Sequence, residues 1–109
     1  MLPALAEGGT IPGYDAAMAA GEPVLIHVTA TWCEVCQAQK PIVASLLGSP
    51  DFSAMKLFEV DFDSQKDVLR MFGARQQSTL IAFVGDREVG RAVGITDPNA
   101  IFALAEKTR

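Results

Sequence analysis

The stretch ATWCEVCQAQKP, residues 30–41, contains both cysteines of the chain, Cys33 and Cys36, with two residues between them. Thiols at this spacing can form a structural disulfide, bind a metal ion, or open and close as a redox pair. A bridge across so small a loop stabilises a protein little, because the entropy removed from the unfolded chain grows with loop length. A purely structural disulfide is therefore the weakest of the three interpretations.

The composition predicts a single domain that needs no disulfide to fold. The chain has 109 residues, of which 50% are hydrophobic, enough for one core. Its net charge is −4 and it has no run of Lys or Arg, which argues against nucleic acid or an anionic membrane surface as a partner. No apolar stretch approaches the roughly 20 residues that a membrane helix needs, so we expect no membrane insertion.

The residues next to the cysteines indicate a strand before them and a helix after them. Residues 24–29 (VLIHVT) form a nearly continuous apolar run, typical of a strand covered on both faces. Residues 34–47 are helical in composition and are followed by Gly48, a common helix stop. Pro41 lies inside this helix, where it removes a backbone donor and should produce a kink.

The rest of the chain adds helices and strands in alternation. The predicted elements are a helix at 14–20, a strand at 56–62, a helix opened by the capping box Ser64-Gln65-Lys66-Asp67 and ending at Phe72, strands at 79–84 and 88–93 joined by Gly85-Asp86-Arg87, and a last helix with Asp97 as N-cap and Pro98 at its first position, through about Lys107. Helices between the first strands imply parallel pairing, and the hairpin adds an antiparallel edge. The predicted fold class is α/β, with helices flanking a central mixed sheet.

Placed in this order, the motifs resemble the thioredoxin family over residues 14–107. The matching features are Trp32-Cys33-Glu34-Val35-Cys36 after a buried strand, Pro41 five residues beyond the second cysteine, Asp61 at the end of the next strand, Thr79 opening the hairpin, and Val93-Gly94 before the last helix. A C-x-x-C between strand and helix, with Trp before it and Pro after it, is a strong signal. The resemblance implies a thioredoxin fold with a four-stranded mixed sheet, in a single domain at residues 13–109.

The resemblance also implies a role for each cysteine. Cys33 should lie at the start of the helix, where unpaired N–H groups and the helix dipole favour a thiolate. It is then the exposed nucleophile that attacks a partner's disulfide, and the deeper Cys36 resolves the mixed disulfide. The family position of Trp32 suggests that its ring shields the sulfurs on one side. No nucleotide, flavin or metal cofactor is implied.

The two residues between the cysteines bear on the direction of electron flow. Glu34 places a negative charge near the Cys33 sulfur and opposes its thiolate, while the helix dipole acts the other way with a similar magnitude of about 1 kcal/mol. Many family members carry Gly-Pro here and strong oxidants often carry Pro-His; this chain has neither. We therefore expect a reductant or a protein of middling potential rather than a strong oxidant.

The chain departs from the thioredoxin pattern at three positions. His27 stands where thioredoxins usually have Asp; as a neutral imidazole it could accept the proton of Cys36, or it could be an ordinary core histidine. Leu57 stands where a lysine usually partners that Asp, so both members of the buried charge pair are missing. Ser78 stands where nearly every thioredoxin has a cis-proline. Since a cis bond before a non-proline residue costs about 3–4 kcal/mol, we expect a trans peptide bond before Ser78.

The Ser78 loop should take part in binding partners. We expect the Ser78 hydroxyl or N–H to donate to the Cys33 thiolate, and the neighbouring backbone to pair with an extended peptide, as in the family. By the same analogy, the residues that contact a partner protein are Trp32, Glu34, Val35, Gln77, Ser78, Thr79 and Gly94.

A metal carrier is the alternative function. Two thiolates could bind copper or zinc, with His27 or Ser78 nearby. Zinc needs three or four protein ligands, whereas the chain offers two thiols and one histidine. A metal shared between two chains stays open at this point.

The first residues have two interpretations that differ in cellular location. Ala4-Leu5-Ala6 before Glu7 has the small-x-small form of a signal-peptidase site, so residues 1–12 could include the end of an export signal. The other interpretation is an alanine-rich N-terminal extension on a cytoplasmic protein. Export would place the protein in an oxidising compartment such as the bacterial periplasm, with a membrane electron donor and oxidised periplasmic proteins as partners, for instance in cytochrome maturation. In both cases we expect a monomer that exchanges electrons with protein dithiols and disulfides.

Overall fold

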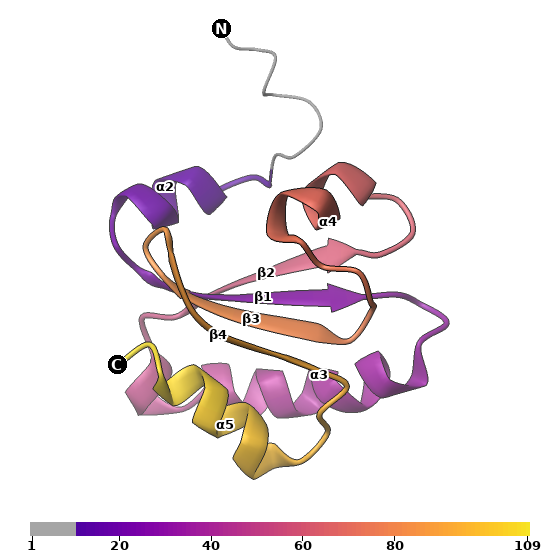
Figure 1. Cartoon of the computed structure of the whole chain (residues 1–109). Coiled ribbons are helices and arrows are strands. Elements are labelled where there is room, and N and C mark those ends of the chain that lie inside the picture. The colour runs from indigo at the N-terminus through magenta and orange to yellow at the C-terminus, as the bar shows by residue number, and fades with distance from the viewer. Residues whose placement is uncertain (1–10) are drawn as a thin grey trace, which may run out of the picture.

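The structure is a computed structural model, and it describes residues 11–109. The signal-peptidase motif at residues 4–6 and most of the predicted N-terminal extension lie outside the described residues. The elements are α2 (Tyr14–Ala19), β1 (Pro23–Thr29), α3 (Glu34–Leu47), the 3-10 turn η1 (Pro50–Phe52), β2 (Lys56–Asp61), α4 (Lys66–Phe72), β3 (Thr79–Val84), β4 (Arg87–Val93) and α5 (Pro98–Glu106) (Figure 1). This is the predicted order of helices and strands, with η1 as an addition.

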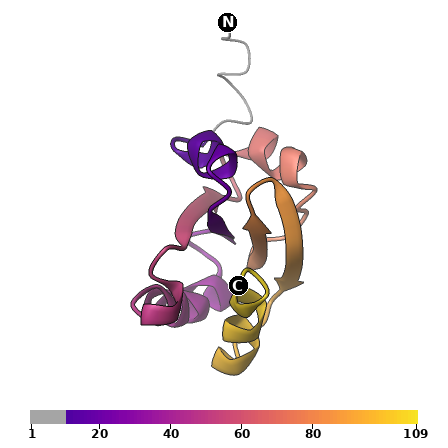
Figure 2. The ribbon, with the colours of Figure 1, turned by 90° about the vertical axis from the view of Figure 1, so that its left-hand side faces the viewer.

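The four strands form one mixed sheet in the order β2-β1-β3-β4. β1 pairs in parallel with β2, and β3 pairs antiparallel with both β1 and β4. The mixed sheet with a C-terminal antiparallel hairpin is therefore confirmed. α2 and α4 cover one face of the sheet and α3 and α5 the other (Figures 1 and 2).

The alternation of side chains along β1 decides what lies beneath each pair of helices. Val24, Ile26 and Val28 join the core under α2 and α4, whereas Leu25 joins the core under α3 and α5. Because successive residues of a strand face opposite sides, His27 shares the face of Leu25. The single histidine is thereby placed on the side of the sheet that α3 covers.

Two local predictions are wrong. Ser64 does not cap α4: its N–H and hydroxyl both donate to the Asp61 carboxylate, at 2.9 and 2.6 Å, so they hold a turn instead of starting a helix. The helix begins after Gln65, which makes no side-chain cap. β4 begins at Arg87, so the hairpin turn consists of Gly85 and Asp86 alone.

Among the described residues, no helix combines the length and the apolar character needed to cross a membrane.

Candidate active site

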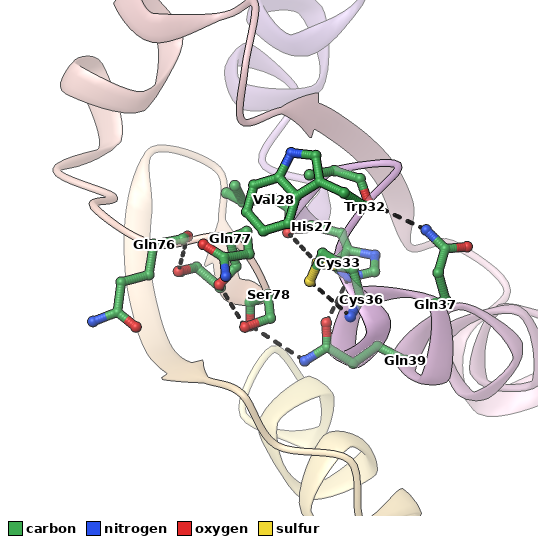
Figure 3. The surroundings of a disulfide bond; sticks show 12 residues. His27, Val28, Trp32, Cys33, Cys36, Gln37, Gln39, Gln76, Gln77 and Ser78 are labelled. Atoms are coloured by element: carbon green, nitrogen blue, oxygen red, sulfur yellow. Dashed lines mark hydrogen bonds between the residues drawn. A yellow bond between two sulfur atoms is a disulfide. The ribbon is translucent and has the colours of Figure 1, made fainter.

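Both cysteines lie at the start of α3, just after the loop that follows β1. Cys33 is the N-cap of α3, with an extended backbone, and its Sγ accepts a hydrogen bond from the Cys36 N–H at 3.0 Å. A sulfur thus takes the place of the oxygen that usually satisfies a free N–H at a helix start. The two cysteines form a disulfide, drawn in Figure 3. The position of the pair at the helix start is confirmed.

The burial of the two sulfur residues is partly unexpected. Cys36 is 0% exposed, as expected for the deeper cysteine, but Cys33 is only 4% exposed. Ala30 and Phe62 pack around the pair. The expectation of an exposed Cys33 is therefore wrong for this disulfide form, in which the Cys33 sulfur is bonded to Cys36 and covered by its neighbours.

Trp32 lies on the outside of the site and is held by a residue far away in the sequence. Its side chain is 56% exposed, and its indole N–H donates to Asp63 Oδ2 at 2.7 Å. The ring also meets Phe62 edge-on, with 6.3 Å between centroids. Asp63 was not predicted as a partner of Trp32, because it lies 31 residues away in the sequence.

Ser78 has the predicted trans peptide bond, and no peptide bond in the described part of the chain is cis. Its φ of 62° was not predicted. The Ser78 N–H donates to the Val28 carbonyl at 2.8 Å, and its hydroxyl donates to the Gln77 carbonyl. The expectation that either donor binds the Cys33 sulfur is therefore wrong in this state, because backbone oxygens already use both.

The other predicted contact residues differ in their exposure. Glu34, Val35 and Gly94 are exposed and Gln77 is half-buried, but Thr79 is 2% exposed, with its hydroxyl donating to the Gln76 carbonyl at 2.7 Å. Pro41 lies on the exposed side of α3, which continues through it, and Asp61 is the last residue of β2.

His27 is fully buried and bound by a residue that the sequence analysis missed. Its Nε2 lies 2.8 Å from the Oε1 of Gln39, a polar residue on the buried face of α3. Burial is the largest influence and lowers the pKa of His27; the Gln39 hydrogen bond and the Glu59 charge act the other way, and Lys40 adds to the lowering. The ring is therefore neutral at pH 7. The signal for Gln39 was its spacing: it follows Cys36 by three residues and shares its helix face.

Residues 10–107 match the family model described as thioredoxin. The chain belongs to the thioredoxin family. Asp f 29, a thioredoxin of Aspergillus fumigatus, is 33% identical over 76 residues, 70% of this chain and 69% of that one. Thioredoxin-2 of Saccharomyces cerevisiae is 33% identical over 89 residues, 81% of this chain and 83% of that one. Among solved structures, Trxlp from Edwardsiella tarda superimposes with a TM-score of 0.83 at 38% identity, over 88% of this chain and 93% of that chain.

Family membership and the bonded Cys33–Cys36 pair identify this thioredoxin-family protein as a thiol–disulfide oxidoreductase that acts on protein disulfides. The metal-carrier alternative gains no support from the geometry. Across residues 11–109, no three side chains of the types His, Cys, Asp and Glu come together as metal ligands would.

Proposed function

We propose that the reduced Cys33/Cys36 pair donates electrons to protein disulfides, and that it is a reductant rather than a strong oxidant. The observation that carries the direction is that α3, the helix that begins at the cysteines, holds no unpaired cation to stabilise the reduced form. The first turn of α3 carries Glu34, and the only basic residue of the helix, Lys40, pairs with Glu59 at 3.2 Å. Strong oxidants of this chemistry owe their potential to a stabilised reduced form, which a nearby cation would supply.

The reaction has two steps. The Cys33 thiolate attacks one sulfur of the partner's disulfide, and the other partner sulfur leaves as a thiolate that takes up a proton. Cys36, as a thiolate, then attacks Cys33 Sγ, and the second partner sulfur leaves with the electron pair of the broken bond. The partner gains two electrons and two protons, and the pair ends as the disulfide. In the second step, neutral His27 accepts the proton that Cys36 must lose.

The partner contacts an exposed apolar surface close to the cysteines. Trp32, Val35 and Val93 are 56%, 39% and 46% exposed, and Glu34 and Gly94 lie beside them in the sequence. Ser78 uses its own N–H and carbonyl within the chain. The hydrogen bonds of the described residues include none from the Gln77 N–H. Pairing with an extended peptide therefore falls to Gln77.

The reduction potential of the pair tests the direction of flow. The protein is equilibrated in glutathione buffers of known ratio, and the oxidised fraction is measured by thiol alkylation. A value near about −270 mV supports the reductant, whereas a value near about −120 mV reverses the direction. Cys33→Ser serves as the control, because it cannot form the intramolecular bridge. If the wild type forms no such bridge at equilibrium, the proposal fails.

For the cellular setting, we propose the periplasm, with a membrane electron donor and a monomeric protein. The support is the Ala4-Leu5-Ala6 motif before Glu7. Fractionation of cells that express the natural gene, together with the N-terminal sequence of the mature protein, tests this location. Recovery of the protein in the cytoplasmic fraction with residues 1–6 intact contradicts it.

The oligomeric state has its own test. Light scattering that gives a mass near 11.6 kDa supports the monomer, and a doubled mass refutes it.

A further inference from the structure

Gln39 and Cys36 face two consecutive residues of β1. They lie one turn apart on the buried face of α3, and both are 0% exposed. Cys36 Sγ is 3.8 Å from the Val28 carbonyl oxygen, and Gln39 Oε1 is 2.8 Å from His27 Nε2. Since His27 and Val28 are consecutive, this turn of α3 holds the cysteine sulfur and the amide over one short stretch of strand (Figure 3).

The orientation of the Gln39 amide is fixed by two loops. Its Nε2 donates to the Ile95 carbonyl at 2.9 Å and to the Ser78 carbonyl at 3.2 Å. A carbonyl oxygen only accepts hydrogen bonds, so the NH₂ end of the amide must point at these two atoms. The flipped amide would set an oxygen against two oxygens and lose both bonds. Oε1 is therefore the end that faces His27.

This orientation decides where His27 carries its proton. Oε1 only accepts, so the contact at 2.8 Å requires a hydrogen on His27 Nε2. A neutral ring has only one such hydrogen, and burial lowers the pKa of His27 so that the ring is neutral. Nδ1 is then the bare nitrogen. It is buried and makes no hydrogen bond within residues 11–109.

The neighbours of the ring leave this assignment in place. On β1's two neighbouring strands, His27 is paired with Glu59 and Leu80. From α3, the charged group that acts on the ring is Lys40, whose ammonium pairs with the Glu59 carboxylate. The charges facing the ring are thus paired with each other, and neither contacts a ring nitrogen.

We infer that Gln39 is a positioning residue that fixes the tautomer of His27, so that Nδ1 is the only ring atom left to take a proton; under the proposed function that proton comes from Cys36. This rests on the proposed function, in which Cys36 attacks Cys33 as a thiolate. In that step the Cys36 S–H bond breaks and the Nδ1–H bond forms. The sulfur keeps the electron pair that becomes the new bond to Cys33, and the imidazolium later returns its proton to solvent or to the departing thiolate.

The tautomer is measured directly by ¹⁵N NMR of the histidine ring in the full chain at pH 7, in the oxidised and the reduced protein. Nitrogens with and without a proton differ widely in chemical shift. We expect Nε2 protonated and Nδ1 bare in both forms. A protonated Nδ1 in either form overturns the inference. Because this measurement needs no partner, it still decides the tautomer if the protein reduces no disulfide and the proposed function fails.

A variant pair tests the consequence for the reaction. Gln39→Met removes the amide at similar length, and Gln37→Met makes the same change at an exposed position whose amide donates to the Ala30 carbonyl and not to His27. We expect Gln39→Met to slow the Cys36 step about tenfold at pH 7, which is part of the roughly 10²–10⁴-fold that a general base contributes, because the ring remains but its tautomer is no longer fixed. The Cys33 step should change less than about twofold, because Cys33 needs no such base.

The pH profile separates this role from a loss of packing. The difference between Gln39→Met and wild type should shrink as the pH is raised to about 9, because hydroxide then competes with the ring as the base that removes the proton. A tenfold loss that persists at that pH, or an equal loss in Gln37→Met, overturns the inference. If Gln39→Met does not fold, the wild-type spectra alone confirm or refute the tautomer.

Discussion

Ser78 occupies a backbone conformation that side chains other than glycine rarely adopt. Its φ is 62°, and it is the only non-glycine residue with positive φ in the described chain. The trans bond leaves an N–H that a proline would lack, and that N–H donates to the Val28 carbonyl. A serine thus closes the loop with a hydrogen bond in the place where the family usually has a proline ring.

At position 78, glycine should give a more stable protein than alanine. Left-handed backbone costs a side-chain-bearing residue about 1–2 kcal/mol, and glycine escapes this. We expect Ser78→Gly to exceed Ser78→Ala by about 1 kcal/mol in the free energy of unfolding, measured in urea. At the exposed neighbour Gln76, whose φ is not positive, the same pair should show no advantage for glycine. Equal stabilities of the two Ser78 variants would contradict the strain.

His27 should make the stability of the protein depend on pH. The unfolded histidine binds a proton near pH 6.5, whereas burial lowers the pKa in the folded state. The neutral ring therefore contributes fully to the free energy of unfolding above about pH 6.5. This contribution is lost as the pH falls toward the pKa of His27 in the folded state. Between pH 7 and 5, the wild type should lose up to about 1.4 kcal/mol per pH unit relative to His27→Leu. The carboxylates titrate in both proteins, so their effect cancels in the difference between wild type and His27→Leu. Parallel plots of the free energy of unfolding against pH for the two proteins would refute the prediction.

The helices begin in different ways, and only the start of α4 differs from the prediction. α5 follows the expected pattern, with Pro98 at its first position and the Asp97 carboxylate accepting from the Asn99 N–H at 3.4 Å. α3 begins with the Cys33 sulfur as acceptor, and α4 begins with no side-chain cap. The sulfur that takes part in the chemistry is thus also part of a helix terminus.

Removal of the Asp97 cap should weaken α5 and its contact with the core. Asp97→Ala leaves the Asn99 N–H without its acceptor, and the loss of such a cap lowers the free energy of unfolding by about 1 kcal/mol. Urea unfolding followed by circular dichroism measures the change. Asp97→Asn keeps an accepting oxygen and should lie within about 0.5 kcal/mol of wild type. If both variants lose the same stability, the charge rather than the hydrogen bond is responsible.

The fold rests on two apolar layers and not on the disulfide. Each face of the sheet has its own cluster of buried side chains, and β1 contributes to both. The disulfide spans residues separated by three in sequence, and the loop-entropy relation gives about 2 kcal/mol for so short a loop. The molecule can therefore open and close the bridge in each catalytic cycle without unfolding.

Reduction of the wild-type protein should leave it folded. We expect dithiothreitol to lower the free energy of unfolding by no more than about 2 kcal/mol, with an unchanged far-ultraviolet spectrum. The double variant Cys33→Ser/Cys36→Ser should not respond to dithiothreitol at all. A reduced wild type that loses its secondary structure would show that the bridge is needed for the fold.

The sequence by itself determined the features that depend on nearby residues. Apolar runs marked the strands, glycines and prolines marked helix ends, and the spacing of Cys33 and Cys36 between β1 and α3 located the redox pair. The trans bond at Ser78 also followed from local chemistry, because a cis bond is costly for any residue but proline.

Only the tertiary structure decided the contacts between distant segments. The Trp32–Asp63 bond spans 31 residues, and the bonds of Gln39 to Ser78 and Ile95 span 39 and 56. Such partners depend on strand order and helix placement, which no short stretch of sequence contains. The burial of Cys33 and the proton position on His27 depend on the same assembled neighbourhood, because both follow from groups that several elements bring together.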